Sequence, residues 1–278
     1  MADHRLFGRQ WSLTVGDRQW TDLRVVFEVQ RSLTKHPDPA QITVYNLARQ
    51  TRSGFYAGEQ VRLVAGYSDA AGLVFSGTLT GLTPNRDGAD YAVTLSCRDG
   101  DAAYRAACRS SYAKGAPLSL VVGDLVSAMG LSLGAGAKQL LAGKSTRGAL
   151  ATVGTGSDCL SKVLAPFGLG YILLDGNVVI LATDGTTADE AILLAPDTGL
   201  VGNPEPITDK PIAPGKKAKR IRVTSLLQPG MVPGRRLQLQ SVEYSGVYRI
   251  DAVQHKGDSH GEDWYSIAEV TQLQGATA

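Results

Sequence analysis

Apolar and polar residues alternate in short runs throughout residues 7–101. In one run Val25, Phe27 and Val29 fall on the same side of an extended chain, which is the pattern of a half-buried strand. Clusters of Gly, Pro, Asp and Ser separate the runs, as at Pro37-Asp38-Pro39. The pattern predicts one compact β domain with strands near residues 11–15, 23–29, 41–47, 60–67, 73–79 and 91–97.

A second β pattern occupies residues 219–273. Short runs rich in β-branched and aromatic residues recur there between turn signals, and this arrangement is typical of a small barrel or sandwich. We expect a strand at 220–223, a proline-framed turn, and three further strands at 237–241, 248–253 and 264–270. The residues from His255 to Asp263 are predicted to form a polar loop. We find no sequence repeat between the two β regions, and a shared fold does not require one.

The apolar period changes between about residues 106 and 200. A helix is predicted after Pro117, ending at Gly130, because its apolar residues recur at helical spacing. A second helix is expected to begin with Ser157 as N-cap and to end at Pro166 and Gly168. The apolar stripes are Leu118, Val121, Val122, Leu125, Val126 and Met129 in the first helix, and Leu160, Val163, Leu164 and Phe167 in the second.

Asp175-Gly176-Asn177 lies between two β-branched runs, which is a strong hairpin signal. Residues 196–215 are rich in proline and are interpreted as an extended connector. At 278 residues the chain is longer than one core usually supports. The predicted division is an N-terminal β domain at 1–105, an α+β domain at 106–200, and a connector with a second β domain at 201–278. The predicted fold class is mainly β with a smaller α+β part.

The C-terminal pattern resembles a known protein family. Its motifs follow the order found in phage tail baseplate hub proteins. They are, in sequence, Leu226-Leu227, Pro229, Pro233-Gly234, an apolar strand, Gly246-Val247-Tyr248-Arg249 and a His-x-Gly-Asp loop closed by Trp264. The segment Ile42–Leu47, followed by the strands containing Gly66-Tyr67 and Phe75-Ser76-Gly77, is similar to the first tube-like barrel of those proteins.

The resemblance implies two tube-like β-barrel domains bracketing a small α+β domain. It also implies a homotrimer, in which two barrels per chain place six similar units around a channel. Such a ring would join the tail tube, or a distal tail protein, to the central spike in the virion. The tape measure protein is a further expected partner, and assembly would take place in the bacterial cytoplasm. Contacts between subunits are expected near Val61–Tyr67 or Leu237–Ser241.

The formal net charge of +2 gives no argument for a dedicated nucleic-acid partner. The resemblance implies that phage DNA passes through the channel, and we expect no specific binding. The basic run from Lys216 to Arg220 and the pair Arg235-Arg236 could contact phosphates, acidic partner surfaces or water. Ala191–Ala195 is among the longest apolar runs and is far shorter than the roughly 20 residues of a membrane helix. With no apolar segment at the N-terminus, we expect a soluble chain without a secretory signal or membrane insertion. Cys97, Cys108 and Cys159 are expected to be reduced, partly buried thiols.

Two short motifs raise the possibility of an enzyme. Gly130-Leu131-Ser132-Leu133-Gly134 matches the nucleophile elbow of a hydrolase, which needs a buried strand before the serine and a helix after it. Here a helix is predicted before Ser132 and a loop after it, so a helix end is the better interpretation. Gly143-Lys144-Ser145 resembles the end of a phosphate-binding loop, but Lys138 occupies the position of the required first glycine.

His255, Asp258, His260, Glu262 and Asp263 form the densest group of ionisable residues and could offer metal ligands. Because all five are expected in one hairpin loop, a polar turn is the preferred interpretation, and no catalytic, cofactor or metal site is predicted. The sequence therefore predicts a structural hub protein without enzymatic activity. The alternatives are a serine hydrolase using Ser132 with a histidine of the last domain, and a carbohydrate- or nucleic-acid-binding β module.

Overall fold

The computed structural model describes residues 7–68, 70–207 and 220–273. Within them the chain forms two compact units. We call the first the β unit; it combines the described residues among Met1–Ser32, Asp38–Arg98 and Asp189–Ala278. The second, the α+β unit, combines Leu33–Pro37 and Asp99–Ala188. No helix in the described parts of the chain has both the length and the apolar character needed to cross a membrane.

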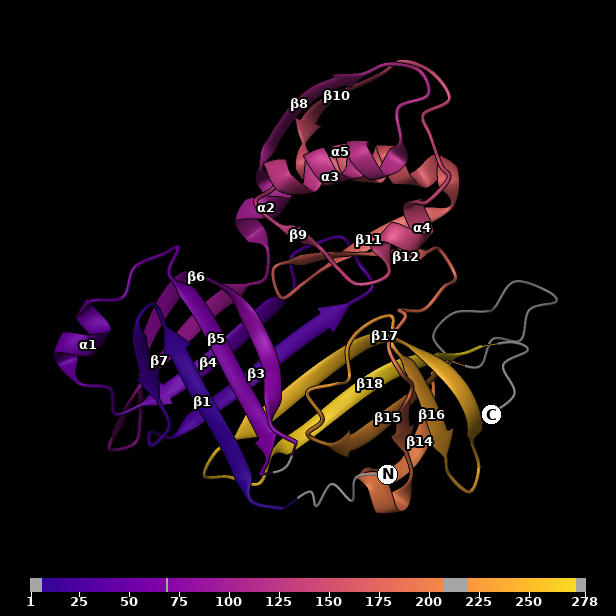
Figure 1. The fold of residues 1–278 in the computed structure, drawn as a ribbon. Helices are drawn as coiled ribbons and strands as arrows, with labels where there is room; N and C mark the ends of the chain where they lie inside the picture. The colour runs from indigo at the N-terminus through magenta and orange to yellow at the C-terminus, as the bar shows by residue number, and fades with distance from the viewer. Residues whose placement is uncertain (1–6, 69, 208–219, 274–278) are drawn as a thin grey trace. The chain divides into compact units, whose positions relative to one another are not determined.

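The β unit contains the two β regions predicted from the sequence, drawn in indigo to magenta and in orange to yellow in Figure 1. The first region has a short helix, α1 (Arg49–Ser53), and seven strands: β1 (Arg9–Val15), β2 (Arg18–Trp20), β3 (Val25–Ser32), β4 (Pro39–Tyr45), β5 (Gln60–Tyr67), β6 (Gly72–Asp87) and β7 (Asp90–Arg98). The second has a 3-10 turn, η2 (Pro196–Thr198), and six strands: β13 (Ile192–Leu194), β14 (Leu200–Pro206), β15 (Arg220–Leu226), β16 (Arg236–Gln240), β17 (Ser245–Asp258) and β18 (Trp264–Gln272).

The two β regions repeat one strand order. In the first region neighbouring strands run β3-β4-β7-β6-β5-β1, and in the second they run β14-β15-β18-β17-β16-β13. Taken in chain order, the strands therefore correspond as β1 to β13, β3 to β14, β4 to β15, β5 to β16, β6 to β17 and β7 to β18. One difference is that β1 pairs with β5 antiparallel whereas β13 pairs with β16 parallel.

A shared irregularity supports this correspondence. The pairing of β6 with β7 shifts between Leu79 and Gly81, and the pairing of β17 with β18 shifts between Ile250 and Ala252. A bulge at the same place in both long strands bends each sheet at the same point. Each region also closes over its own apolar core, one around Leu13, Ile42 and Leu95, the other around Val223, Leu239 and Ile250. The fold class predicted from the sequence, mainly β with a smaller helical part, is confirmed.

The α+β unit consists of two small sheets and four short helices. Strand β8 (Ala107–Tyr112) pairs with β10 (Leu150–Thr155), while β11 (Leu169–Leu174), β12 (Asn177–Ala182) and β9 (Ser132–Leu133) form the second sheet. Asp175 and Gly176 have positive φ angles, which makes the tight turn of the predicted hairpin. The helices are α2 (Asp101–Arg105), α3 (Leu118–Ala128), α4 (Ala137–Leu141) and α5 (Gly156–Leu164), and the 3-10 turn η1 (Ala165–Phe167) follows α5.

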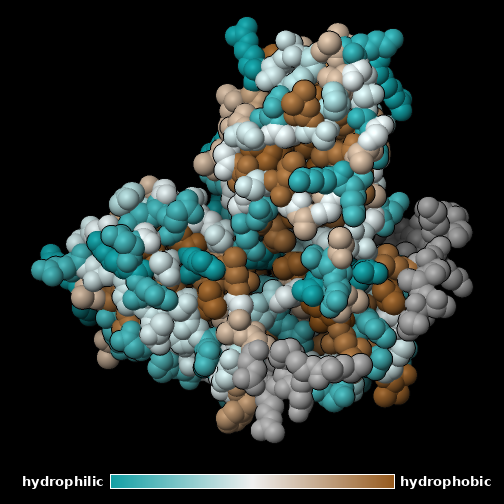
Figure 2. Space-filling model, in the orientation of Figure 1, coloured by the Kyte–Doolittle hydropathy of each residue, from teal (hydrophilic) through white to brown (hydrophobic). Residues whose placement is uncertain are grey.

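The apolar stripe predicted for the first long helix is confirmed, since all six of its residues are buried in the core of this unit. The second helix begins earlier than predicted: the Thr155 side chain accepts the hydrogen bond from the Asp158 N–H, so Thr155 rather than Ser157 is the N-cap. Figure 2 shows apolar side chains grouped over α3 and α5, near the top of the view. All three cysteines are buried free thiols, and burial raises the pKa of Cys97 to about 12.

The structure differs from the expected division near residue 200. The interpretation of 196–215 as a connector was wrong for its first half, because Leu200–Pro206 forms strand β14, which pairs with β15. Pro204 and Pro206 both lie in β14. Residues 208–219 lie outside the described residues. Proline is compatible with a strand at the edge of a sheet. The sequence pattern did not reveal that residues 200–206 form such an edge strand. Because the two β regions have separate cores but share one sheet, their status as independent folding domains stays a prediction.

Candidate functional site

The two β regions meet where the second half of β17 pairs with β3. This antiparallel ladder runs from Ala252 opposite Ser32 to Asp258 opposite Val26. The first half of β17 pairs on the same side with β16, and β18 covers the other side. One long strand therefore belongs to the second region and also continues the sheet of the first, as β17 and β3 show in Figure 1. We call the β3–β17 ladder and its flanking side chains the internal joint.

Aromatic packing fills the internal joint. The ring centroids of Phe27 and Trp264 are 5.5 Å apart, in an edge-on arrangement, and Trp264 is 1% exposed. The Trp264 indole N–H donates a hydrogen bond of 3.2 Å to the Gly66 carbonyl of β5. A Cβ atom on Gly257 would lie 2.3 Å from Phe27, so only glycine lets these rings approach the β17 backbone. Trp264 therefore belongs to the second region by sequence and to the first core by packing.

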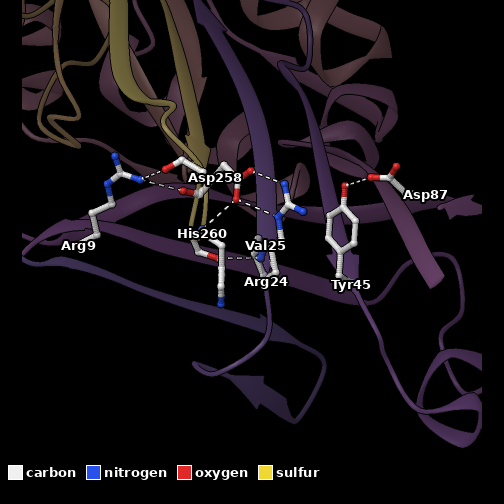
Figure 3. Close-up of polar contacts among 9 residues, drawn as sticks. Arg9, Arg24, Val25, Tyr45, Asp87, Asp258 and His260 are labelled. Carbon is white, nitrogen blue, oxygen red and sulfur yellow. Dashed lines mark hydrogen bonds and ion pairs between the residues drawn. The ribbon is translucent and has the colours of Figure 1, made fainter. Parts of the chain in front are cut away.

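A polar clamp closes one end of the internal joint, as Figure 3 shows. The Arg24 guanidinium donates two hydrogen bonds to the Asp258 carboxylate, at 3.2 Å from Nε and 2.7 Å from Nη2. The backbone of Val25 exchanges two hydrogen bonds with Ser259, each of 2.9 Å. Arg24 also stacks on the Tyr45 ring, 4.5 Å from its centroid. The loop that follows β17 is thereby fixed to the start of β3.

Arg9 reinforces the clamp from β1. Its guanidinium donates hydrogen bonds to the backbone carbonyls of Asp258, Gly261 and Glu262, and it lies 5.4 Å from the centroid of the Trp264 ring. Burial by itself raises the pKa of Asp258, but the hydrogen bonds from Arg24 and from the backbone outweigh it and hold that pKa below its usual range. The carboxylate is therefore charged at neutral pH and paired with Arg24.

The clamp leads to a testable expectation for stability. Asp258→Asn removes the charge that Arg24 contacts, and we expect the free energy of unfolding at pH 7 to fall by about 1–2 kcal/mol, as for a charge-assisted hydrogen bond at a partly exposed site. The corresponding residue of the first region is Asp87, which is exposed and accepts one hydrogen bond from the neutral Tyr45 hydroxyl at 3.1 Å. Asp87→Asn is the matched control and should change the unfolding free energy by less than about 0.5 kcal/mol. Equal effects in urea denaturation would contradict the clamp.

His255 is fully buried in β17, and its position corrects the sequence prediction, which placed it in an exposed loop. Its Nδ1 lies 2.8 Å from the Ser266 hydroxyl oxygen of β18. Burial, with a contribution from the Arg31 charge, lowers the pKa of His255 to about 3, against an opposing effect of the Met231 backbone. The strand extends to Asp258, so only residues 259–263 form the loop. His255 is a neutral core residue at neutral pH.

The remaining candidate metal ligands are engaged or dispersed. Asp258 pairs with Arg24, and His260 Nδ1 lies 2.8 Å from the Ser259 hydroxyl. Across the described ranges of the chain, no three His, Cys, Asp or Glu side chains gather in a way that could hold a metal ion. The five ionisable residues singled out in the sequence thus divide between a strand core, a clamp and a polar turn.

Ser132 lies in β9, after α3 and before α4. This order differs from a nucleophile elbow, in which the serine occupies the turn between a strand and a helix. Of the two histidines of the last domain, His255 is buried with its Nδ1 2.8 Å from the Ser266 hydroxyl, and His260 Nδ1 lies 2.8 Å from the Ser259 hydroxyl. The Lys144 carbonyl accepts a hydrogen bond from the Leu118 N–H, so the Gly143–Ser145 segment packs back on the start of α3.

The basic residues of the second β region contact their own chain. Arg220 and Arg222 both pair with Glu269, at 3.1 and 3.2 Å, and Arg235 donates to the carbonyls of Glu190 and Gly230. Arg236 donates to the Asp189 carbonyl at 3.4 Å. Lys216, Lys217 and Lys219 lie outside the described residues.

The two segments predicted to contact other subunits are paired on both sides over most of their length. Val61–Tyr67 lies in β5, between β1 and β6, and Leu237–Ser241 overlaps β16, between β13 and β17. Over the residues paired on both sides, these segments can reach a partner only through a face of the sheet. Within the part of the chain that the structure describes, the short strands β2 and β13 of the β unit pair on one side only, with β1 and β16. Two longer stretches also have an open edge: the second half of β6, at Gly81–Asp87, pairs only with β7, and β14 pairs only with β15. Sequence reasoning missed both, since it ended the first strand at Leu79 and did not identify the second.

Solved structures of other proteins share this architecture. No family model matches the sequence, and no curated protein matches it. Among solved structures, the chain is similar to a 43 kDa tail protein of prophage MuSo2 from Shewanella oneidensis, at 10% identity, over 95% of this chain and 98% of that one, with a TM-score of 0.67. A tail protein from Neisseria meningitidis MC58 gives 13% identity over 96% and 97%, with a TM-score of 0.64.

A third similar structure is the c3393 protein of E. coli, at 10% identity, over 95% of this chain and 77% of that one, with a TM-score of 0.61. That protein is described as a component of the type VI secretion system with structural similarity to the bacteriophage T4 tail proteins gp27 and gp5. The likeness extends over both units and both β regions rather than over one barrel alone. The chain thus has the fold of these tail proteins, which confirms at the level of the fold the resemblance found in the sequence.

Proposed function

We propose that this protein is a structural baseplate hub of a phage tail or of a related contractile injection system. In this proposal three copies form a ring with pseudo-sixfold symmetry, which joins the tail tube, or a distal tail protein, to the central spike. The tape measure protein and the passing DNA are further neighbours, and the DNA is not specifically bound. The protein would act in the virion tail, after assembly in the bacterial cytoplasm, and without enzymatic activity.

The observation that carries this proposal is the repeated strand order within the β unit. Two copies of one topology lie side by side in a single chain, joined by β17 of the second region and β3 of the first. The joint is heterologous, because it uses different strands of the two repeats. A heterologous contact that is repeated around an axis closes into a ring when its rotation divides a full turn. Three chains with two repeats each supply six similar units, which suits a sixfold tube and a threefold spike.

The proposal predicts a defined mass in solution. Light scattering of the purified protein should give three times the chain mass of 29.4 kDa, either for the protein alone or, once the partner's mass is subtracted, for its complex with a tail tube or spike protein. Negative-stain images of that species should show a ring with six similar lobes. A monomer that persists in every condition would count against the ring, and a dimer or an open filament would show that the joint does not close in the proposed way.

A further inference from the structure

We propose that the second half of β6 in one copy of this chain pairs antiparallel with β14 of the next copy, in the register that β17 and β3 use inside each chain. This inference rests on the proposed ring and names the strands and residues through which it closes. The partner is therefore a second copy of this chain, and the joint is an edge-to-edge strand pair.

The register follows from the repeated topology. Measured from the shared bulge, Ala252 corresponds to Gly81, so Lys256 corresponds to Asn85 and Asp258 to Asp87. The partner side is aligned through β4 and β15. In the first region Glu28 lies opposite Gln41, which in turn lies opposite Ser96 of β7. In the second region Glu205 lies opposite Arg222, which in turn lies opposite Glu269 of β18. Ser96 and Glu269 are equivalent, because each is the first partner after the shared bulge. Glu205 therefore corresponds to Glu28.

The exposure of the side chains distinguishes the internal joint, between β17 and β3, from the equivalent strands β6 and β14. On β3 and on the second half of β17, buried residues alternate with others, and Val253, His255 and Gly257 are buried. On β6 every residue from Thr83 to Asp87 is exposed, and on β14 Val201 and Glu205 are exposed. The first pair of edges is covered within the chain, whereas the second pair has no strand partner among the described residues, and we call these two the bare edges. An unpaired strand edge presents free N–H and C=O groups that favour the addition of another strand.

Prolines on the two bare edges agree with this register. Pro84 corresponds to His255 and Pro206 to Val29, and His255 lies opposite Val29 in the internal joint. The two prolines would therefore face each other between chains, so both missing N–H donors fall on one pair of residues and the neighbouring pairs stay intact. Elsewhere each proline discourages pairing with an arbitrary strand, because proline cannot donate to a ladder.

The polar pairing of the internal joint is also partly reproduced. The Glu28 carboxylate accepts a hydrogen bond of 2.6 Å from the Gln254 amide and lies 3.8 Å from the Lys256 ammonium. In the copied register Glu205 would face Asn85, whose amide can donate to a carboxylate as Gln254 does. Opposed side chains of this kind contribute to the stability of a strand pair, while like charges would oppose it.

A disulfide between chains tests the register. The three native cysteines are buried, so an exposed cysteine pair can be introduced without background reaction. The double variant Asn85→Cys/Glu205→Cys places two thiols directly opposite each other, where Cβ atoms of an antiparallel pair are about 4.5–5.5 Å apart and a bridge needs little backbone movement. Mild oxidation should convert most of the protein to covalent dimers and trimers on a non-reducing gel, and reduction should reverse this.

Controls separate this inference from the ring itself. Each single variant should give no covalent trimer, and Asn85→Cys/Glu243→Cys, whose second cysteine lies in the exposed loop after β16, should cross-link at least tenfold less. Light scattering is run on the same samples. A trimer without cross-links, or with equal cross-linking in the control pair, overturns the proposed register but leaves the ring standing. A monomer in every condition overturns the proposed function and this joint with it.

Discussion

Replacing Trp264 with alanine is expected to lower the free energy of unfolding of the β unit by about 3–5 kcal/mol, the usual range for removing a large buried aromatic side chain. The indole is 1% exposed, packs edge-on against Phe27 and donates to the Gly66 carbonyl. Its removal leaves a cavity in the first core and takes away the hydrogen bond to the Gly66 carbonyl of β5. Urea unfolding followed by circular dichroism measures the change.

Tyr91 provides the matched control, because it occupies the position in β7 that Trp264 occupies in β18: Tyr91 lies opposite Arg86, and Trp264 lies opposite Gly257. In the single chain Tyr91 is only partly buried and stacks with Arg52, 3.6 Å from the ring centroid. Tyr91→Ala should therefore cost about half as much or less, given the smaller apolar area it buries. A loss below about 1 kcal/mol for Trp264→Ala, or equal losses for the two variants, would show that the internal joint contributes little to stability.

The second large effect is a loss of stability in mild acid that depends on His255. In the unfolded chain this imidazole binds a proton below about pH 6.5, whereas in the folded chain its pKa is about 3. The unfolded state therefore binds more protons between these values, and stability that is present above pH 6.5 is lost as the pH falls. The slope is about 1.4 kcal/mol per pH unit, so we expect a loss on the order of 2 kcal/mol from this residue between pH 6.5 and pH 5.

His255→Gln isolates this contribution. Glutamine is neutral at every pH and keeps a polar group near the Ser266 hydroxyl, so the variant is less stable at pH 7 but should show a flatter dependence on pH between 6.5 and 5. Asp158 and Asp258, whose pKa values are lowered, lose their contribution only in stronger acid. All other ionisable groups are common to the two proteins, so the comparison isolates His255. Parallel pH profiles of the unfolding free energy for the wild type and the variant would contradict the burial of a neutral His255.

Much of the local structure could be predicted because it depends on local periodicity. The alternation of Val25, Phe27 and Val29 reports a half-buried strand, and the helical spacing from Leu118 to Met129 reports one face of a helix. Both patterns follow from backbone geometry, which repeats every two residues in a strand and every 3.6 in a helix. The Asp175-Gly176 turn is local in the same sense, since positive φ angles favour these residues.

Positions set by distant partners could not be predicted in this way. His255 looked like part of a polar loop, because its neighbours in the sequence are polar, yet β3 and β18 bury it. Asp258 looked like one of several clustered acids, and only the fold brings Arg24 to it across more than two hundred residues. The strand at 200–206 was hidden by its prolines, whose compatibility with a strand depends on which edge of the sheet they face.

The sequence by itself determined most of the strands of the two β regions, the two longer helices and the Asp175-Gly176 hairpin, that the chain is mainly β, and, through the order of its C-terminal motifs, which kind of fold to expect. Only the tertiary structure decided that the two β regions repeat one strand order, that β17 joins them, and which strand edges remain open. The physical reason is that periodicity depends on residues that are close together in the sequence, whereas strand order, burial and ion pairing depend on contacts between segments far apart in the chain.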